Sequence, residues 1–205
     1  MTASSALQRA VETPRPSAIP RRAVLVVVLA LMGATHGASV ARATVFHAKD
    51  EALALAFPGS DRVEDRAVIL TDEQKAAVEK RAHAPLESQL WTVYVGWRGT
   101  ELLGYAVIDT HTVRTLPETA MVVLSPSGEV RRVEILAFYE PPEYTPPERW
   151  TRQFDGRHLD DDLKLGAAVH GITGATLSAT AFTAAVRRVL ALYAVLSEAG
   201  VLAAK

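Results

Sequence analysis

The sequence predicts an α+β fold in which an antiparallel sheet, built from two hairpins, packs against helices. Two pairs of apolar, alternating segments are each joined by a short turn, within residues 90–108 and 119–138. Helix-forming segments precede and follow these pairs, and the final one, residues 178–199, is long and amphipathic. Strands grouped between helices favour an antiparallel sheet over alternating βαβ units.

The segments before the hairpins predict two helices and one strand. Alanine and leucine recur at helical spacing in residues 47–58, which end at a Pro-Gly-Ser turn. Residues 62–70 alternate in part and predict a strand. Thr71 and Gln74 then have the spacing of a capping box, which predicts a helix over residues 72–81.

The first strand of the first predicted hairpin has one face that we expect to be buried. Alternate residues of segment 90–97 form one strongly apolar face, which we expect to meet the core: Trp91, Val93, Val95 and Trp97. An Arg-Gly turn leads to the returning strand, residues 102–108. A Ser-Pro-Ser-Gly turn joins the strands of the second hairpin, residues 119–124 and 130–138.

A proline-rich segment, residues 139–148, follows the second hairpin. Its two Pro-Pro pairs exclude a central strand or a helix interior. Tyr144 lies in this segment, between Tyr139 and Trp150. These aromatic side chains could cover a planar ligand, or they could pack beneath a long loop.

The final helix carries a stripe of apolar residues at three- and four-residue spacing: Phe182, Ala185, Val186, Val189, Leu190, Tyr193 and Leu196. We expect this stripe to be buried. Arg187 and Arg188 lie elsewhere on the helix and are predicted to point to solvent or to a partner. Gly200 is a plausible residue to end the helix in the left-handed conformation.

Residues 170–178, His-Gly-Ile-Thr-Gly-Ala-Thr-Leu-Ser, form the most informative segment because they lead directly into the final helix. Glycines allow close approach of a ligand, and Thr173, Thr176 and Ser178 supply hydroxyl groups. A helix N-terminus presents unpaired N–H groups and a partial positive charge to a phosphate. The alternative is an ordinary helix start capped by Thr176 or Ser178.

Thr173, Gly174, Ala175 and Thr176 resemble the [Ser/Thr]-Gly-Ala-Thr motif of the FMN-binding domain family. That family includes flavin-carrying subunits of the sodium-pumping NADH:quinone reductase and of the Rnf complex. Further segments resemble the family and extend the resemblance to about residues 90–196: Val133 to Leu136 with Glu140-Pro141, Arg149-Trp150, and Gln153 to Gly156.

The resemblance implies that FMN is joined to Thr176 by a phosphoester bond, which a dedicated flavin transferase installs. The neighbours Thr173, Gly174, Ala175 and Ser178 would then surround the phosphate. An acidic residue usually stands six positions before the acceptor in this family, and here that position is His170. Glu140 would be a carboxylate of the flavin pocket, or simply an exposed charge at a strand end.

The N-terminal residues predict an export signal. Arg21 and Arg22 precede a short apolar stretch, residues 23–32, and Ala41-Arg42-Ala43 matches a cleavage site. We expect residues 1–43 to be removed, leaving a single FMN-binding domain over residues 44–205. The alternative is an uncleaved membrane anchor.

Composition excludes several classes of protein. The net charge is −1 and no basic stripe is present, which argues against nucleic acid as a partner. The chain has no cysteine, which excludes iron–sulfur ligation, disulfides and c-type haem attachment within it. The histidines lack metal-ligand spacing, and the Asp160–Asp162 run resembles a solvated turn more than a calcium loop, so we expect no metal site.

Together, these features predict an exported, periplasmic or otherwise extracytoplasmic flavoprotein. It would carry electrons between membrane or periplasmic redox proteins instead of converting a small substrate. The alternative is a periplasmic FMN-binding or sensor module without redox turnover.

Overall fold

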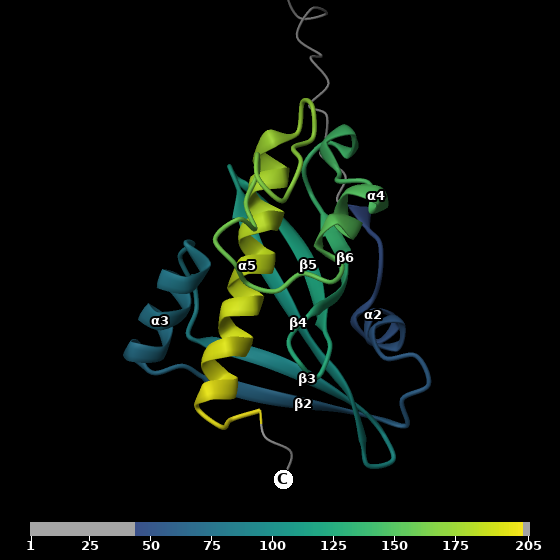
Figure 1. Ribbon diagram of the computed structural model, residues 1–205. Coiled ribbons are helices and arrows are strands. Elements are labelled where there is room, and N and C mark those ends of the chain that lie inside the picture. Colours follow the sequence, from purple (N-terminus) through teal and green to yellow (C-terminus); the bar gives the residue numbers. More distant parts are fainter. Residues whose placement is uncertain (1–43, 203–205) are drawn as a thin grey trace, which may run out of the picture. The chain divides into compact units, whose positions relative to one another are not determined.

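The computed structural model of the protein describes residues 44–202 (Figure 1). The expected export signal, residues 1–43, lies outside the described residues.

One six-stranded antiparallel sheet, in the order β1-β6-β5-β4-β3-β2, forms the centre of the fold. The strands are β1 (Thr44–Val45), β2 (Arg62–Ile69), β3 (Leu90–Arg98), β4 (Glu101–Val113), β5 (Leu116–Leu124) and β6 (Val130–Phe138). The two predicted hairpins are present, but β4 and β5 are longer than expected. They extend to a tight turn at Arg114 and Thr115, so that β3 to β6 form one continuous meander.

Helical segments flank the sheet and confirm the α+β prediction. They are α2 (Lys49–Ala56), α3 (Asp72–Ala82), η1 (Pro142–Tyr144), α4 (Glu148–Thr151), η2 (Arg152–Phe154) and α5 (Thr176–Glu198). The predicted capping box at the start of α3 is present, because Thr71 and Gln74 each bond to the other's backbone N–H. Gly200 has a φ of 69° and follows the end of α5 as predicted.

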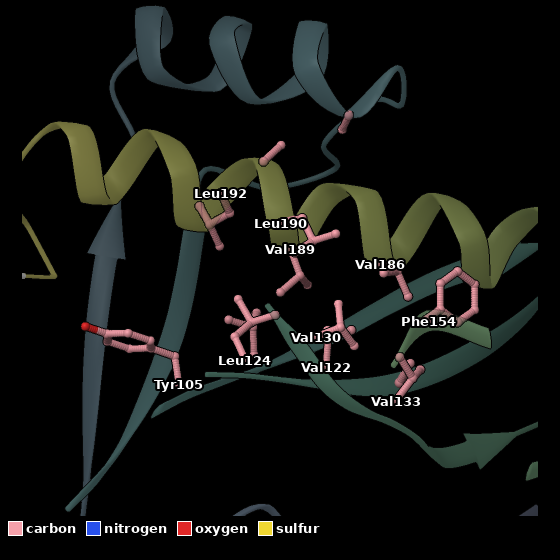
Figure 2. Packing of buried hydrophobic residues seen from close by; sticks show 14 of the residues in the cluster. Tyr105, Val122, Leu124, Val130, Val133, Phe154, Val186, Val189, Leu190 and Leu192 are labelled. Atoms are coloured by element: carbon pink, nitrogen blue, oxygen red, sulfur yellow. The ribbon is translucent and has the colours of Figure 1, made fainter. Parts of the chain in front are cut away.

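The main core lies between α5 and one face of the sheet. Val186 and Val189 point from α5 toward the sheet residues Val122 and Val130 (Figure 2). The predicted apolar face of β3 contributes to this core through Val93, Val95 and Trp97, with Trp91 packed against it. Since these side chains come from segments far apart in the sequence, their burial holds the helix across the sheet.

A smaller core covers the opposite face of the sheet beneath α2. Phe57, directly after α2, packs with Tyr94 and Met121 in this cluster. Gly96 of β3 makes room for the Phe57 ring, because a Cβ on Gly96 would lie 2.4 Å from ring carbons. Both faces of the sheet are therefore covered, and α5 lies on the face opposite α2.

The helix α5 is buried more completely than a single apolar stripe predicts. Of its 23 residues, 14 are buried, because α3 and the loop before α5 cover the side that the sheet leaves open. The helix is apolar and long enough to cross a membrane, but 72% of its most apolar window is buried inside the protein. Its apolar composition is therefore accounted for by packing in the core.

The predicted exposure of Arg187 is wrong, since this side chain is only 6% exposed. Its guanidinium donates to the carbonyl oxygens of Arg81 and Ala82 at the end of α3, at 3.1 and 2.7 Å. It also donates to the carbonyls of Asp160 and Leu163, at 2.7 and 3.1 Å. These hydrogen bonds compensate the buried positive charge and hold α3 and the loop against α5.

We predict that Arg187→Met lowers the free energy of unfolding by about 3 kcal/mol, because several buried carbonyl groups lose their donor. Urea denaturation would measure the change. The matched control is Arg149→Met, since Arg149 is exposed on α4. Equal stability of the two variants would contradict this role for Arg187.

Candidate functional site

A pocket of about 250 Å³ lies at the N-terminal end of α5. Three separate parts of the chain form it: the β4–β5 turn, the proline-rich loop, and the start of α5. We call it the Thr176 pocket, and its lining residues are Val113, Arg114, Glu140, Tyr144, Gly174, Ala175, Thr176, Leu177 and Ser178. The structure thus brings together six of the nine candidate residues.

The turn into α5 leaves Thr176 accessible. Gly174 has a φ of 82°, a left-handed conformation that favours glycine. Ala175 is the N-cap residue, and no side chain of the described residues caps the helix there. The alternative in which Thr176 or Ser178 caps the helix is therefore wrong. Thr176 is the first helical residue and is exposed, whereas Ser178 is buried.

The uncapped start of α5 offers backbone hydrogen-bond donors to a ligand. The first N–H groups of a helix have no acceptor within the helix, and here no side-chain cap replaces one. The first turn, Thr-Leu-Ser-Ala, also contains no acidic residue. This end of α5 can therefore donate hydrogen bonds to an anion.

Arg114 adds a positive charge to the pocket, and sequence reasoning missed it. It lies at the tip of the β4–β5 turn with a φ of 55°, a conformation uncommon for a residue other than glycine. Its side chain is exposed. The sequence offered no signal beyond a cation between two strands, because only the pairing of β4 with β5 brings this turn to α5.

Three candidate residues do not line the pocket. Trp150 is buried, packs edge-on against Phe154 with ring centroids 5.3 Å apart, and donates from Nε1 to the carbonyl of His170 at 2.6 Å. Gln153 Oε1 accepts from the backbone N–H of His170 at 2.8 Å. For Trp150 the packing interpretation is therefore correct, whereas Tyr144 is 37% exposed and lines the pocket.

These contacts explain the Arg-Trp and Gln-Phe segments of the sequence. Trp150 and Gln153 hold the backbone of His170, while the side chains of His170 and Thr173 are exposed on the loop. The segment therefore positions the loop that leads to Thr176.

Four charged side chains lie buried next to the Thr176 pocket, between α5 and the β4–β5 hairpin. We call them the buried charge cluster: Asp109, His111, Glu118 and Arg188, which are 2%, 6%, 0% and 8% exposed. Arg188 Nε and Nη2 donate to the two oxygens of Asp109, at 2.8 and 2.7 Å. The predicted exposure of Arg188 is therefore wrong, and its fork-shaped guanidinium forms a bidentate pair.

His111 lies between two carboxylates within the cluster. Its Nδ1 is 2.9 Å from Asp109 Oδ1, and its Nε2 is 3.6 Å from Glu118 Oε2. The edge of its ring also packs against Phe182, with centroids 5.5 Å apart. The sequence analysis did not predict this cluster, because it ended the returning strand at residue 108. In the structure β4 continues to Val113, and its alternate residues Asp109 and His111 face α5.

The surroundings shift the pKa of both Asp109 and His111. Burial alone would raise the pKa of the Asp109 carboxyl, but hydrogen bonds and charges from Arg188 and His111 lower it from 3.8 to about 2. Burial would lower the pKa of His111, but the hydrogen bond to Asp109 and the nearby carboxylate of Glu118 outweigh that effect and raise it. Both shifts favour charged groups inside the protein.

Metal binding has no comparable support. Within residues 44–202, no group of three or more histidine, aspartate or glutamate side chains is arranged to hold a metal ion. The Asp160–Asp162 run lies in an exposed turn.

The fold and the pocket define an α+β domain with a pocket at the uncapped start of its last helix. The family model of the FMN-binding domain matches residues 116–191, from the start of β5 into α5. This segment, which includes the Thr176 motif, is therefore similar to the FMN-binding domain family. No curated protein matches the chain.

We predict that Asp109→Asn lowers the free energy of unfolding at neutral pH by about 3 kcal/mol, because it breaks a buried ion pair. The folded pKa of Asp109 lies below its ordinary value, so its contribution is present above pH 3.8 and is lost as the pH falls toward 2. The difference from the wild type should therefore shrink over this interval in urea denaturation.

The control is Asp162→Asn, since Asp162 is exposed. A stability difference for Asp109→Asn that stays constant from pH 5 to 2 would contradict the assigned ion pair.

Proposed function

We propose that this protein carries FMN through a phosphoester bond to the Thr176 hydroxyl and transfers electrons between partner redox proteins. The observation that carries the proposal is the exposure of Thr176 at an uncapped helix start, in a pocket shared with Arg114. The family match supports FMN as the ligand.

The residues of the Thr176 pocket suit the parts of FMN. The first-turn N–H groups of α5 and the Arg114 guanidinium would donate to the phosphate. Glu140 would accept hydrogen bonds from ribityl hydroxyls, and the exposed Tyr144 ring offers an aromatic surface. The residues therefore fit the ligand that the family implies.

The helix start alone is too weak to retain the cofactor, which favours a covalent bond. A helix N-terminus stabilises an anion by about 0.3–1 kcal/mol at an exposed site. A flavin transferase would break the pyrophosphate bond of a flavin dinucleotide, join Thr176 Oγ1 to the FMN phosphorus, and release the nucleoside monophosphate with the hydroxyl proton. When bound, FMN supplies the redox chemistry, and the protein supplies attachment and orientation.

We predict that Thr176→Ala abolishes covalent FMN after co-expression with a flavin transferase, because no hydroxyl remains at this position. Thr176→Ser should retain some flavin. Peptide mass spectrometry of the 170–178 segment would measure the product. Thr180→Ala, one turn further along α5, is the control, and an FMN phosphoester on any other residue would refute the assignment.

We predict that Arg114→Gln weakens noncovalent FMN binding by about tenfold, because it removes a charged hydrogen-bond donor from the phosphate. Fluorescence titration of the flavin would measure the affinity. Riboflavin, which lacks the phosphate, should bind the variant and the wild type equally. An equal loss for both flavins would show that Arg114 does not contact the phosphate.

We further propose that the protein acts outside the cytoplasm, after removal of residues 1–43, with membrane or periplasmic redox proteins as partners. The short apolar stretch and the Ala-Arg-Ala site support this proposal. N-terminal sequencing of the mature protein should begin at Thr44, whereas a membrane-bound chain that begins at Met1 would contradict export with cleavage.

A second candidate is a binding or sensor module of the same family without redox turnover. His170 favours it, because this residue stands where the family resemblance implies an acidic group for efficient loading. Flavin that remains on the protein after denaturation would favour the electron carrier. Colourless protein from a host with an active flavin transferase would favour the module.

A further inference from the structure

The buried charge cluster and one wall of the Thr176 pocket belong to the same hairpin and are close together in the sequence. His111 precedes the pocket residues Val113 and Arg114 by two and three positions on the same hairpin. Glu118 lies opposite His111 on β5, just beyond the turn. The ring of Phe182, one turn after Ser178, packs on His111 from α5.

We propose that His111 and Glu118 are positioning residues of the FMN pocket, which hold the β4–β5 turn against the start of α5 through a buried ion pair that requires the His111 proton. The identity of the ligand in this statement rests on the proposed function. The positioning of the β4–β5 turn depends only on side chains of this chain.

Charge balance in the cluster shows why a proton is needed. The groups that face His111 are Asp109 from its own strand, Glu118 from β5 and Arg188 from α5. Glu87 also lines the adjoining cavity from the segment before β3. With a protonated imidazole, the four members of the buried charge cluster carry two positive and two negative charges. Without that proton, they carry a net negative charge inside the core.

Glu118 is the member of the cluster whose charge depends most on the His111 proton for compensation. Its side chain is fully buried, and neither its carboxylate oxygens nor His111 Nε2 has a hydrogen-bond partner among residues 44–202. The imidazolium 3.6 Å away is the charge that compensates this carboxylate across the two strands. A buried carboxylate without such compensation is costly.

Loss of the proton therefore acts on the pocket through the hairpin. The pairing of β4 with β5 near His111 and Glu118 would loosen, because water or a shifted backbone must then stabilise the carboxylate. Val113 and Arg114 would move relative to Thr176, which α5 holds in place. A cavity of about 340 Å³, lined partly by Asp109, His111 and Arg188, gives protons access to the cluster.

The direction of the pH effect follows from the raised pKa of His111. The positioning effect is complete below the ordinary pKa of 6.5 and is lost as the pH rises through the higher folded value.

The test is a pH titration by NMR of the full chain before flavin loading. The ring signals of His111 and the backbone amide signals of Val113, Arg114 and Thr176 should change together, with one midpoint above 6.5. Glu118→Gln should lower that midpoint by about one to three pH units, because it removes a neighbouring negative charge. Glu118→Asp should restore part of the shift.

A matched control pair joins the segment before α2 to β6 of the same sheet. His47 Nε2 lies 3.6 Å from Glu134 Oε1, the same separation as in the buried pair, but Glu134 is only half-buried. Glu134→Gln should leave the titration of the pocket amides unchanged. Pocket amides that do not follow His111, or that respond equally to both Gln variants, would overturn the inference.

FMN binding separates this inference from the proposed function. If both hold, the affinity for FMN falls over the same pH interval as the amide titration, and Glu118→Gln shifts that interval downward. If FMN neither binds at any pH nor becomes attached to Thr176 in the presence of a flavin transferase, while the amides follow His111, the proposed function fails and the positioning inference stands. Unchanged FMN affinity across the His111 titration would reject the pair as positioning residues.

Discussion

The packing of α5 across one face of the sheet is the interaction on which the rest of the structure depends. It joins apolar residues of the meander, α3 and the long loop before α5 into one core (Figure 2). It also determines where Thr176 lies, because the first residue of the helix must emerge at the end of the β4–β5 hairpin. A site at the start of a buried helix is held in place on the helix side, which suits the cofactor attachment that we propose.

A helix buried on most sides requires that its polar groups be satisfied inside the protein. Arg187 meets this requirement with backbone carbonyls, and Arg188 meets it with a carboxylate. The N-terminus of α5 is different, because no side chain of the described residues caps it. The same helix thus has interior charges that are compensated and an N-terminus whose N–H groups can donate to an anion.

Local patterns predicted most elements of the fold. Alternation in the strands, the capping box at Thr71 and the glycine after α5 each act within a few residues, and the structure confirms them. Periodicity alone was insufficient for Arg187 and Arg188. A single apolar stripe implies a polar outer face, but here α3, the loop and the hairpin cover that face.

The sequence by itself determined the α+β class, the order of the elements and the Thr-Gly-Ala-Thr motif before the last helix, because these depend on residue periodicity and on short-range chemistry. Only the tertiary structure decided that Arg114, Glu140 and Tyr144 share a pocket with Thr176, while Trp150 supports the loop from the core. It likewise decided that Asp109, His111, Glu118 and Arg188 meet. Those contacts depend on strand register and on the placement of a helix across the sheet, which involve residues far apart in the chain.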